Sequence, residues 1–378
     1  MTLQRRDLRE EMAPQMKSKR LVSLTLAAAA LAFASPAFAD DGEHDPDEVK
    51  LSTLWYLHSI YGSRPEGNYS AFRVGRGYLT AKLQPEDYFA ARITLDAHQN
   101  DEGDMAVRLK YLYGQFFFGD LGSIVTDTNL EYGLVHTPWL DYEEHINHYR
   151  MQGTMFVERN NLFNSADFGL TLGGLFGKKL DDEYTKKVSK YYPGTFGSFA
   201  VGVYNGGGYH AEEANENKTV EGRVSVRPLG PILPNLQLSY FGLYGKGNTE
   251  EAPDWQVHAG MASFEHEYFV LSATYSAGKG NQKGDQVAAD GEASRFAGYS
   301  GFAEVKFPWI DSSLIGRYDR FDWDTDGGPA PTQRFVWGAA YHFYGHNAIL
   351  VDWDWLIDED QSEPVEKTVK ATLQVSLP

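Results

Sequence analysis

The sequence predicts an all-β fold, a transmembrane antiparallel β-barrel of about sixteen strands, and three observations lead to this prediction. Apolar and polar residues alternate with a period of two in many segments. Short and long connections alternate along the chain. Aromatic residues make up 14% of the chain, and many stand near the ends of predicted strands. The three features together are typical of an outer-membrane barrel.

The two-residue period is clearest in residues 88–98, where the odd positions are apolar and most even positions are polar. The same alternation recurs in residues 219–227, 268–276 and 368–377. Each such strand has one apolar face and one polar face. The pattern therefore predicts a sheet that separates water from an apolar environment.

Turn signals separate these strands into pairs. Tight links are expected at residues 85–87, 119–122, 230–235, 265–267, 308–311 and 345–347. Longer polar links are expected at residues 63–69, 99–104, 210–218, 248–254, 281–295, 325–332 and 358–366. Residues 178–194 depart from the pattern, because a long, charged link stands where a short one is due. Sixteen strands leave about 21 residues for each strand and its link, enough for the ~9–11 residues that cross a bilayer.

The apolar faces could contact lipid or a protein core. The chain has 23 Tyr, 22 Phe and 8 Trp, and membrane barrels place such residues in girdles at the two interfaces. This favours the membrane, while a secreted β-sandwich or solenoid is the alternative.

The N-terminus predicts export. A basic segment (16–20), an apolar run (21–33) and a small-residue cleavage site at Ala37 to Ala39 form a secretory signal. We therefore expect residues 1–39 to be an N-terminal extension plus signal peptide that is removed. Residues 40–50 are then an acidic periplasmic leader, and residues 51–378 form the barrel.

Composition excludes several classes of protein. Removing residues 1–39 changes the formal charge from −18 to −21, so nucleic acid is not expected as a partner. The chain has no cysteine and therefore no disulfide. Beyond the signal, no apolar run approaches the ~20 residues of a membrane helix.

Several short motifs resemble the phosphate-selective porin O and P family of Gram-negative outer membranes. They are FRVGRGYLT (72–80), EYGLVHTPW (131–139), NSADFG (164–169), VYNGGG (203–208) and GRYDRFD (316–322). The resemblance covers nearly the whole mature chain in order. It implies a sixteen-stranded barrel in the outer membrane, usually a homotrimer, whose third long loop folds inward to narrow the pore.

The stretch HTPWLDYEEHINHYR (136–150) lies where that loop belongs. We expect it to line a constriction, in which charged side chains bias the passage of ions. The residues assigned to this role are Glu143, Glu144, His145, His148 and Arg150. The alternatives are a packing or trimer-contact loop, and a metal or catalytic site. A metal or catalytic site is disfavoured because the stretch has no HExxH motif. A catalytic zinc also needs three correctly positioned ligands, each oriented by a further hydrogen-bond partner.

A Lys or Arg that faces lipid at mid-bilayer destabilises the barrel by ~2–4 kcal/mol. Cations in the middle of the strands are therefore expected to face the lumen. The residues predicted to line the pore on this ground are Arg73, Arg92, Arg108, Lys110, Arg223, Arg227 and Arg317. The alternation of faces would turn Arg76 to the side opposite Arg73, toward lipid. Arg76 therefore needs either a β-bulge or a place near the rim of the barrel. The alternative is that these cations merely pair with acids on the same face.

The expected function is passive diffusion of small ions or solutes. The resemblance implies anions such as phosphate, whereas acidic side chains in the long loops would repel them within ~8–10 Å. We also consider a barrel that sheathes a partner such as an electron-transfer protein, and an outer-membrane enzyme. No catalytic residues, cofactor or metal are predicted, and the expected partners are outer-membrane lipid and lipopolysaccharide.

Overall fold

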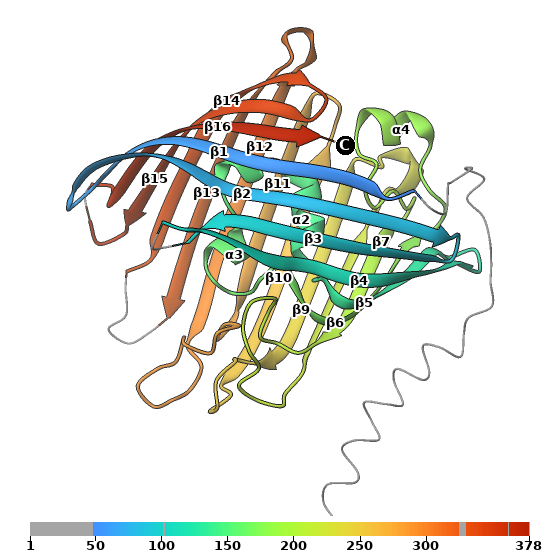
Figure 1. The fold of residues 1–378 in the computed structure, drawn as a ribbon, viewed down its shortest axis with the longest axis horizontal. Helices are drawn as coiled ribbons and strands as arrows, with labels where there is room; N and C mark the ends of the chain where they lie inside the picture. The colour runs from blue at the N-terminus through green and yellow to red at the C-terminus, as the bar shows by residue number, and fades with distance from the viewer. Residues whose placement is uncertain (1–47, 101–102, 325–329, 362, 378) are drawn as a thin grey trace, which may run out of the picture.

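A computed structural model describes residues 48–100, 103–324, 330–361 and 363–377. The predicted signal peptide and nearly all of the acidic leader lie outside these residues. The described chain forms one closed antiparallel barrel of sixteen strands, which confirms the predicted fold (Figure 1). Closure results from the pairing of β1 with both β2 and β16.

The strands follow one another around the barrel in sequence order. They are β1 (Lys50–Arg64), β2 (Gly67–Glu86), β3 (Phe89–Gln99), β4 (Met105–Leu121), β5 (Val125–His136), β6 (Ala166–Phe176), β7 (Gly197–Tyr204), β8 (Thr219–Val226), β9 (Leu236–Lys246), β10 (Asp254–Glu265), β11 (Phe269–Lys279), β12 (Arg295–Phe307), β13 (Ser312–Asp324), β14 (Thr332–Tyr344), β15 (Asn347–Asp358) and β16 (Glu366–Leu377).

Helical segments occur only in the links of the described chain. They are α2 (Leu140–Ile146), η1 (Arg150–Gln152), α3 (Phe156–Arg159), α4 (Asp182–Lys187), η2 (Gly230–Ile232) and η3 (Pro308–Ile310). Among the described residues, no helix is both long enough and apolar enough to cross a membrane.

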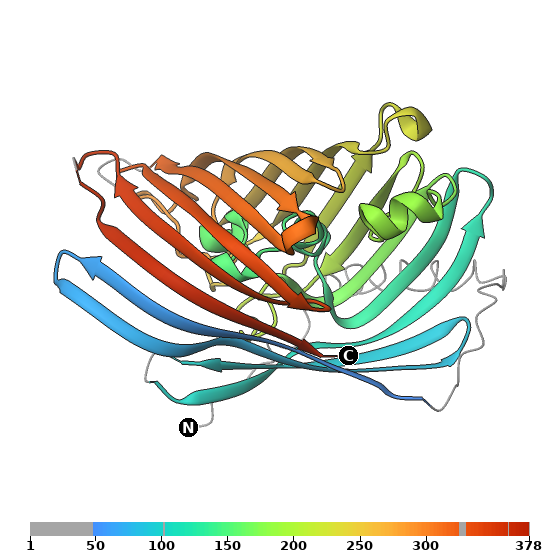
Figure 2. The same cartoon turned by 90° about the horizontal axis from the view of Figure 1, so that it is seen from above.

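The strands have the two faces that the alternation predicts. In β8, Glu221 and Arg223 are buried on the inner side, whereas Val220 and Val224 are each 47% exposed on the outer side. An apolar outer face suits lipid, and a polar inner face suits water. In this barrel, however, much of the inner face is covered by protein, as Figure 2 shows for the helices between β5 and β6.

A β-bulge in β2 turns Arg76 to the inner side, which is one of the two alternatives that the sequence allowed for it. The register between β1 and β2 shifts between Tyr56 and Leu57, where Gly75 is the additional residue. A Cβ at position 75 would meet the imidazole of His58, so a larger residue there would require that side chain to move. The Arg76 guanidinium then reaches the inward carboxylate of Asp96 at 2.7 Å.

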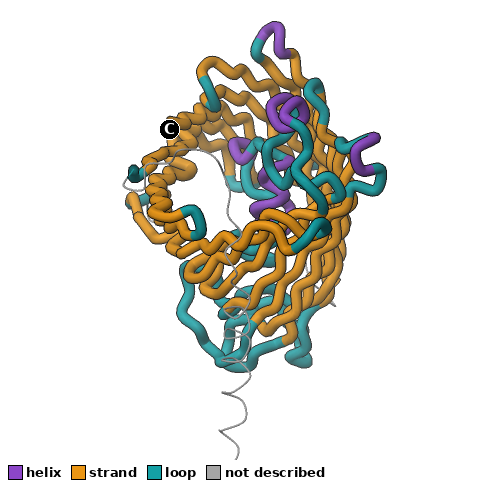
Figure 3. The backbone as a smooth tube through the Cα atoms, turned by 90° about the vertical axis from the view of Figure 1, so that its right-hand side faces the viewer, coloured by secondary structure: helices purple, strands orange, loops and turns teal. Residues whose placement is uncertain are grey.

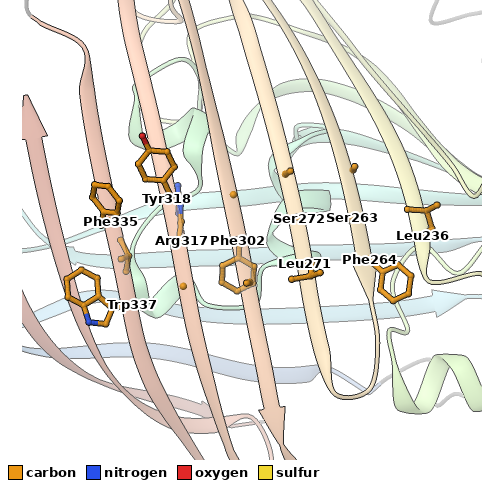
Figure 4. A pocket seen from close by; sticks show the side chains of 16 residues that line it. Leu236, Ser263, Phe264, Leu271, Ser272, Phe302, Arg317, Tyr318, Phe335 and Trp337 are labelled. Carbon is orange, nitrogen blue, oxygen red and sulfur yellow. The ribbon is translucent and has the colours of Figure 1, made fainter. Parts of the chain in front are cut away.

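One hollow of the surface lies outside the barrel. It is a shallow groove of about 650 Å³ over β9 to β14, where Leu271, Phe335 and Trp337 face outward (Figure 4). Its floor includes Gly301 and Gly316, where an added Cβ would meet no other atom within 4 Å. An exposed apolar surface of this kind on a barrel faces lipid rather than the lumen.

Candidate functional site

The link between β5 and β6, residues 137–165, carries α2, η1 and α3 and is here called the third long loop. Asp141 and Glu143 lie in the first turn of α2 and His145 in its last, an order that suits the helix dipole. Trp139, Leu140 and Met155 are 0% exposed. Figure 3 shows these helical segments within the outline of the ring of strands.

Hydrogen bonds hold the loop against the inner face of β9 to β13. The Tyr142 hydroxyl lies 2.9 Å from Ser239 Oγ, and the Tyr149 hydroxyl donates to Glu304 at 2.8 Å. The Arg317 guanidinium donates to the carbonyl of Thr154 at 2.9 Å. Because these contacts span several strands, the loop is attached to the wall along most of its length.

Aromatic packing adds to this attachment. The Trp139 ring lies 5.6 Å from Phe241, and Phe156 lies 5.9 Å from Phe321. Rings at such separations stabilise by about 0.5–1.5 kcal/mol beyond their buried area. The loop thus forms a hydrophobic core inside the barrel with β9, β10 and β13.

Three of the arginines predicted to line the pore are buried: Arg223 and Arg317 beneath the third long loop, and Arg227 beneath the β6–β7 link and the turn after β8. Arg223 is 1% exposed and donates to the Pro138 carbonyl at 3.0 Å, while its guanidinium lies 4.2 Å from the centre of the Tyr142 ring. Arg227 is 2% exposed and donates to the carbonyls of Tyr192, Gly194 and Pro234. Arg317 is 5% exposed and forms two hydrogen bonds with Asp319. All three therefore contact protein rather than open lumen.

The remaining predicted arginines and the lysine lie on β2 to β4, away from the β9–β13 wall that the loop covers. Arg108 bonds Asp96 at 3.0 Å, which also accepts from Arg76. Arg92 donates toward His136, and Arg73 is exposed on the inner side beside His58. Basic side chains facing inward on these strands are Arg73, Arg76, Lys82, Arg92, Arg108 and Lys110.

Tyrosine rings support this basic surface, a feature that the sequence analysis missed. Lys110 Nζ lies 4.6 Å from the centre of the Tyr78 ring, and the guanidinium of Arg92 lies 4.7 Å from that of Tyr111. Arg108 stacks in the same way on Tyr209. The electron-rich ring faces stabilise cations without neutralising them. Tyr78 and Tyr111 stand two and one positions from Arg76 and Lys110, which was the available signal, whereas Tyr209 is distant in the sequence.

The loop presents charges of both signs. Arg150 contacts Glu144 at 3.1 Å and Glu158 at 3.3 Å. His148 is exposed, and the side chain of His145 is 30% exposed. Glu143 is buried and accepts a 2.9 Å hydrogen bond from Trp139 Nε1, so it lies behind the loop surface. Burial raises the pKa of Glu143 to about 7, although Arg317 and the Trp139 N–H act in the opposite direction.

The long link between β6 and β7 lies at the rim of the barrel where the other links are short, here called the short-turn rim. From that side it contacts the third long loop. The Tyr192 hydroxyl donates to Asp141, and the Tyr191 ring stacks on His145 with 3.6 Å between centroids. A cavity of about 340 Å³ remains between this link, α2 and β4 to β7. The unexpected length of residues 178–194 thus has a structural use, since a tight turn would not reach α2.

Polar cavities and charged side chains characterise this part of the barrel interior. Within the described ranges, no group of three or more His, Asp or Glu side chains could hold a metal ion. A second polar cavity, of about 250 Å³, is lined by Lys82, Arg92 and Tyr113. Charged groups on opposite sides of a narrow passage bias which ions enter it.

Comparisons with known proteins agree with this architecture. The family model described as Gram-negative porin matches residues 25–373. A search of curated protein sequences finds no match. The family match does not extend to the narrower phosphate-selective O and P family that the motifs resemble.

Solved structures share the fold at low identity. The anion-selective porin from Comamonas acidovorans aligns with a TM-score of 0.61 and 11% identity, over 87% of this chain and 99% of that chain. Salmonella typhi OmpF, in a complex with daunomycin, aligns with a TM-score of 0.60 and 12% identity, over 87% and 98%. A loop L8 deletion mutant of Vibrio cholerae OmpT gives 0.57 and 11%, over 88% and 100%.

Proposed function

Because the chain belongs to the Gram-negative porin family, which places its barrel in the outer membrane, we propose that it is a passive diffusion porin that favours small anions. The passage lies between the third long loop and the basic surface of β2 to β4. No chemical step is involved, since a concentration gradient and the electric field drive solutes through.

The unpaired cations of β2 to β4 carry this proposal. Among the described residues, Arg73, Lys82 and Arg92 have no carboxylate within 4.0 Å, and all three are less buried than Lys110, which is 6% exposed. Two acids of the loop, Glu144 and Glu158, share one cation, Arg150, and contact none of these wall cations. A passing anion therefore meets positive charge that no acid of the wall neutralises.

Phosphate is included in this proposal as one of the small anions. Arginine and lysine both donate charge-assisted hydrogen bonds to phosphate oxygens. The resemblance to the phosphate-selective porins supports this choice, as does the similar fold of the anion-selective Comamonas porin. We further propose a homotrimer, because one of the similar structures is the trimer form of Vibrio cholerae OmpT.

Single-channel recording in a planar bilayer tests the function. We expect discrete current steps and a reversal potential of anionic sign across a KCl gradient, with block of the chloride current by added phosphate. Replacing Lys82 and Arg92, which line the same cavity, together by Gln is expected to lower the anion-to-cation permeability ratio about fivefold, since a charge a few ångströms from the ion contributes ~1 kcal/mol in water.

The matched control is Arg320→Gln, which removes a cation from the outer side of β13. It is expected to leave the permeability ratio unchanged. A cationic reversal potential for the natural chain would contradict anion preference but keep the porin. Absence of steps from a folded, heat-modifiable barrel would overturn the porin itself.

A further inference from the structure

Two polar cavities inside the barrel, both toward the short-turn rim, have linings of opposite charge. The cavity of about 250 Å³ is lined by Lys82 and Arg92. The cavity of about 340 Å³ is lined by Glu131 and Asp141. Gln115 lines both of them, so the two cavities meet at this side chain. We call them the basic cavity and the acidic cavity.

The wall of the basic cavity holds three cations side by side. Lys50, Lys82 and Arg92 are successive register partners across β1, β2 and β3. Like charges at such positions repel one another. Among the described residues that line this cavity, Glu48 is the one acid, and none of the three cations has a carboxylate within 4.0 Å. The basic cavity therefore has a surplus of positive charge.

The acidic cavity has the opposite balance. The Asp, Glu and Lys side chains that line it are Asp127, Glu131, Asp141 and Lys190. Asp127 is balanced by Lys179, whose Nζ lies 3.2 Å from it. Within the described ranges, neither Glu131 nor Asp141 has a Lys or Arg within 4.0 Å, and their partners in ion-pair range are imidazoles. Two carboxylates therefore outnumber the one exposed ammonium of Lys190.

The imidazoles leave this negative charge in place. Arg92 Nη1 lies 3.1 Å from His136 Nε2, and His136 Nδ1 lies 2.9 Å from Glu131 Oε2. Because a guanidinium only donates, Nε2 is the acceptor, and the neutral ring has its one proton on Nδ1, directed at Glu131. Burial lowers the pKa of His145, although Asp141 acts in the opposite direction. The ring of His136 thus separates the positive group from the negative group without neutralising either.

Opposite charges held apart in this way suit a solute that has both signs of charge. The anionic group of such a solute would accept charge-assisted hydrogen bonds from Lys82 and Arg92. Its ammonium group would donate to Glu131 and Asp141 on the other side of the His136 ring. A solute with two anionic ends would be repelled by the acidic cavity, and a solute with two cationic ends would be repelled by the basic cavity.

We propose that the two cavities together bind zwitterionic solutes whose ammonium and anionic groups are separated by a short chain. This inference rests on the proposed function, because solutes reach the site through the passage of the barrel, and it names a class of solute for that passage. It does not rest on the overall ion preference, since binding here depends on the local charges of the two cavities.

Influx of radiolabelled solutes into proteoliposomes that contain the mature chain tests the proposal. The probes are zwitterionic 4-aminobutyrate, the dianion glutarate and the dication 1,4-diaminobutane, which have similar lengths and differ in their terminal charges. We expect 4-aminobutyrate to reach half-saturation at a concentration about tenfold lower than either of the others, equivalent to ~1.4 kcal/mol. Influx of 4-aminobutyrate that does not saturate, or equal half-saturation of all three solutes, would overturn the proposal.

Two variants each alter one end of the site. Glu131→Gln keeps an acceptor for His136 but removes the negative charge, so it is expected to raise the half-saturating concentrations of 4-aminobutyrate and 1,4-diaminobutane about tenfold and not that of glutarate. Lys82→Gln is expected to raise those of 4-aminobutyrate and glutarate and not that of 1,4-diaminobutane. Lys82 is exposed, so this variant serves if Glu131→Gln does not fold. A change that is equal for all three solutes would indicate a structural effect and would contradict the site.

The matched control is Glu183→Gln/Lys187→Gln, an exposed pair of α4 at the same rim whose charged groups lie 2.8 Å apart. It is expected to leave all three half-saturating concentrations unchanged, and a loss equal to that of the test variants would overturn the proposal. Single-channel recording on the natural chain separates the two proposals. Current steps without selective influx of 4-aminobutyrate would overturn only the zwitterion site, whereas a cationic reversal potential with selective influx would overturn only the anion preference.

Discussion

The two halves of the barrel wall use arginine in different ways. On β8 and β13, Arg223 and Arg317 are 1% and 5% exposed and hold the third long loop by its carbonyls. On β3 and β4, Arg92 and Arg108 lie over tyrosine rings on the side that this loop leaves uncovered. Arginine side chains point inward in both halves. In one half they hold the loop against the wall, and in the other they face the proposed passage. The position of the loop determines which role an arginine has.

The largest effect is expected from separating the loop from its wall. Trp139→Ala removes a fully buried indole and the hydrogen bond to Glu143. We expect the free energy of opening of the loop to fall by about 3–5 kcal/mol, measured by amide hydrogen exchange of residues 140–159. Trp309→Ala is the control, because Trp309 is 72% exposed at the short-turn rim. Unchanged exchange in Trp139→Ala would contradict the packed loop.

A matched pair of substitutions tests the comparison directly. Arg223→Gln leaves buried carbonyl and hydroxyl partners without a donor and is expected to lower the opening free energy of the loop by about 2–3 kcal/mol. Arg92→Gln is expected to change ion selectivity with little effect on hydrogen exchange. Ion selectivity and amide hydrogen exchange of the loop are measured on both variants. A change in selectivity without faster exchange in Arg223→Gln would place Arg223 in the passage.

A smaller effect concerns pH. The raised pKa of Glu143, about 7 against an ordinary value of 4.5, means that the folded loop favours the protonated acid. Its contribution to stability is complete below the ordinary value and is lost as the pH rises through 7. Between pH 5.5 and pH 8, the opening free energy should fall by about 2 kcal/mol more in the natural chain than in Glu143→Gln. Equal slopes in the two proteins would contradict burial of this carboxyl.

The barrel itself was predictable because lipid and water impose a period of two on every strand. Residues 88–98 and 219–227 show that period and form β3 and β8. For Arg76 the alternation allowed either a bulge or a place near the rim, and the structure shows the bulge, at Gly75. These inferences use local rules, because each strand needs only its own alternation to reveal its two faces.

The candidate site was less accessible to the same reasoning. Parity indicates that Arg223 points inward, but it does not reveal that Pro138 and Tyr142 cover it. Nor does the sequence order indicate that the Tyr191 ring would stack on His145, which lies in a different link. Such contacts join segments that are distant in the chain, and their geometry depends on how the loop packs.

The sequence alone therefore determined the sixteen-stranded barrel, its orientation of polar and apolar faces and the link in which the third long loop lies. Only the tertiary structure decided which inward cations remain open to the passage and which become part of the loop's attachment. The physical reason is that the alternation of polar and apolar residues reflects the environment on each face of a single strand. The solvation and charge pairing of a side chain depend instead on which other strands and loops lie beside it.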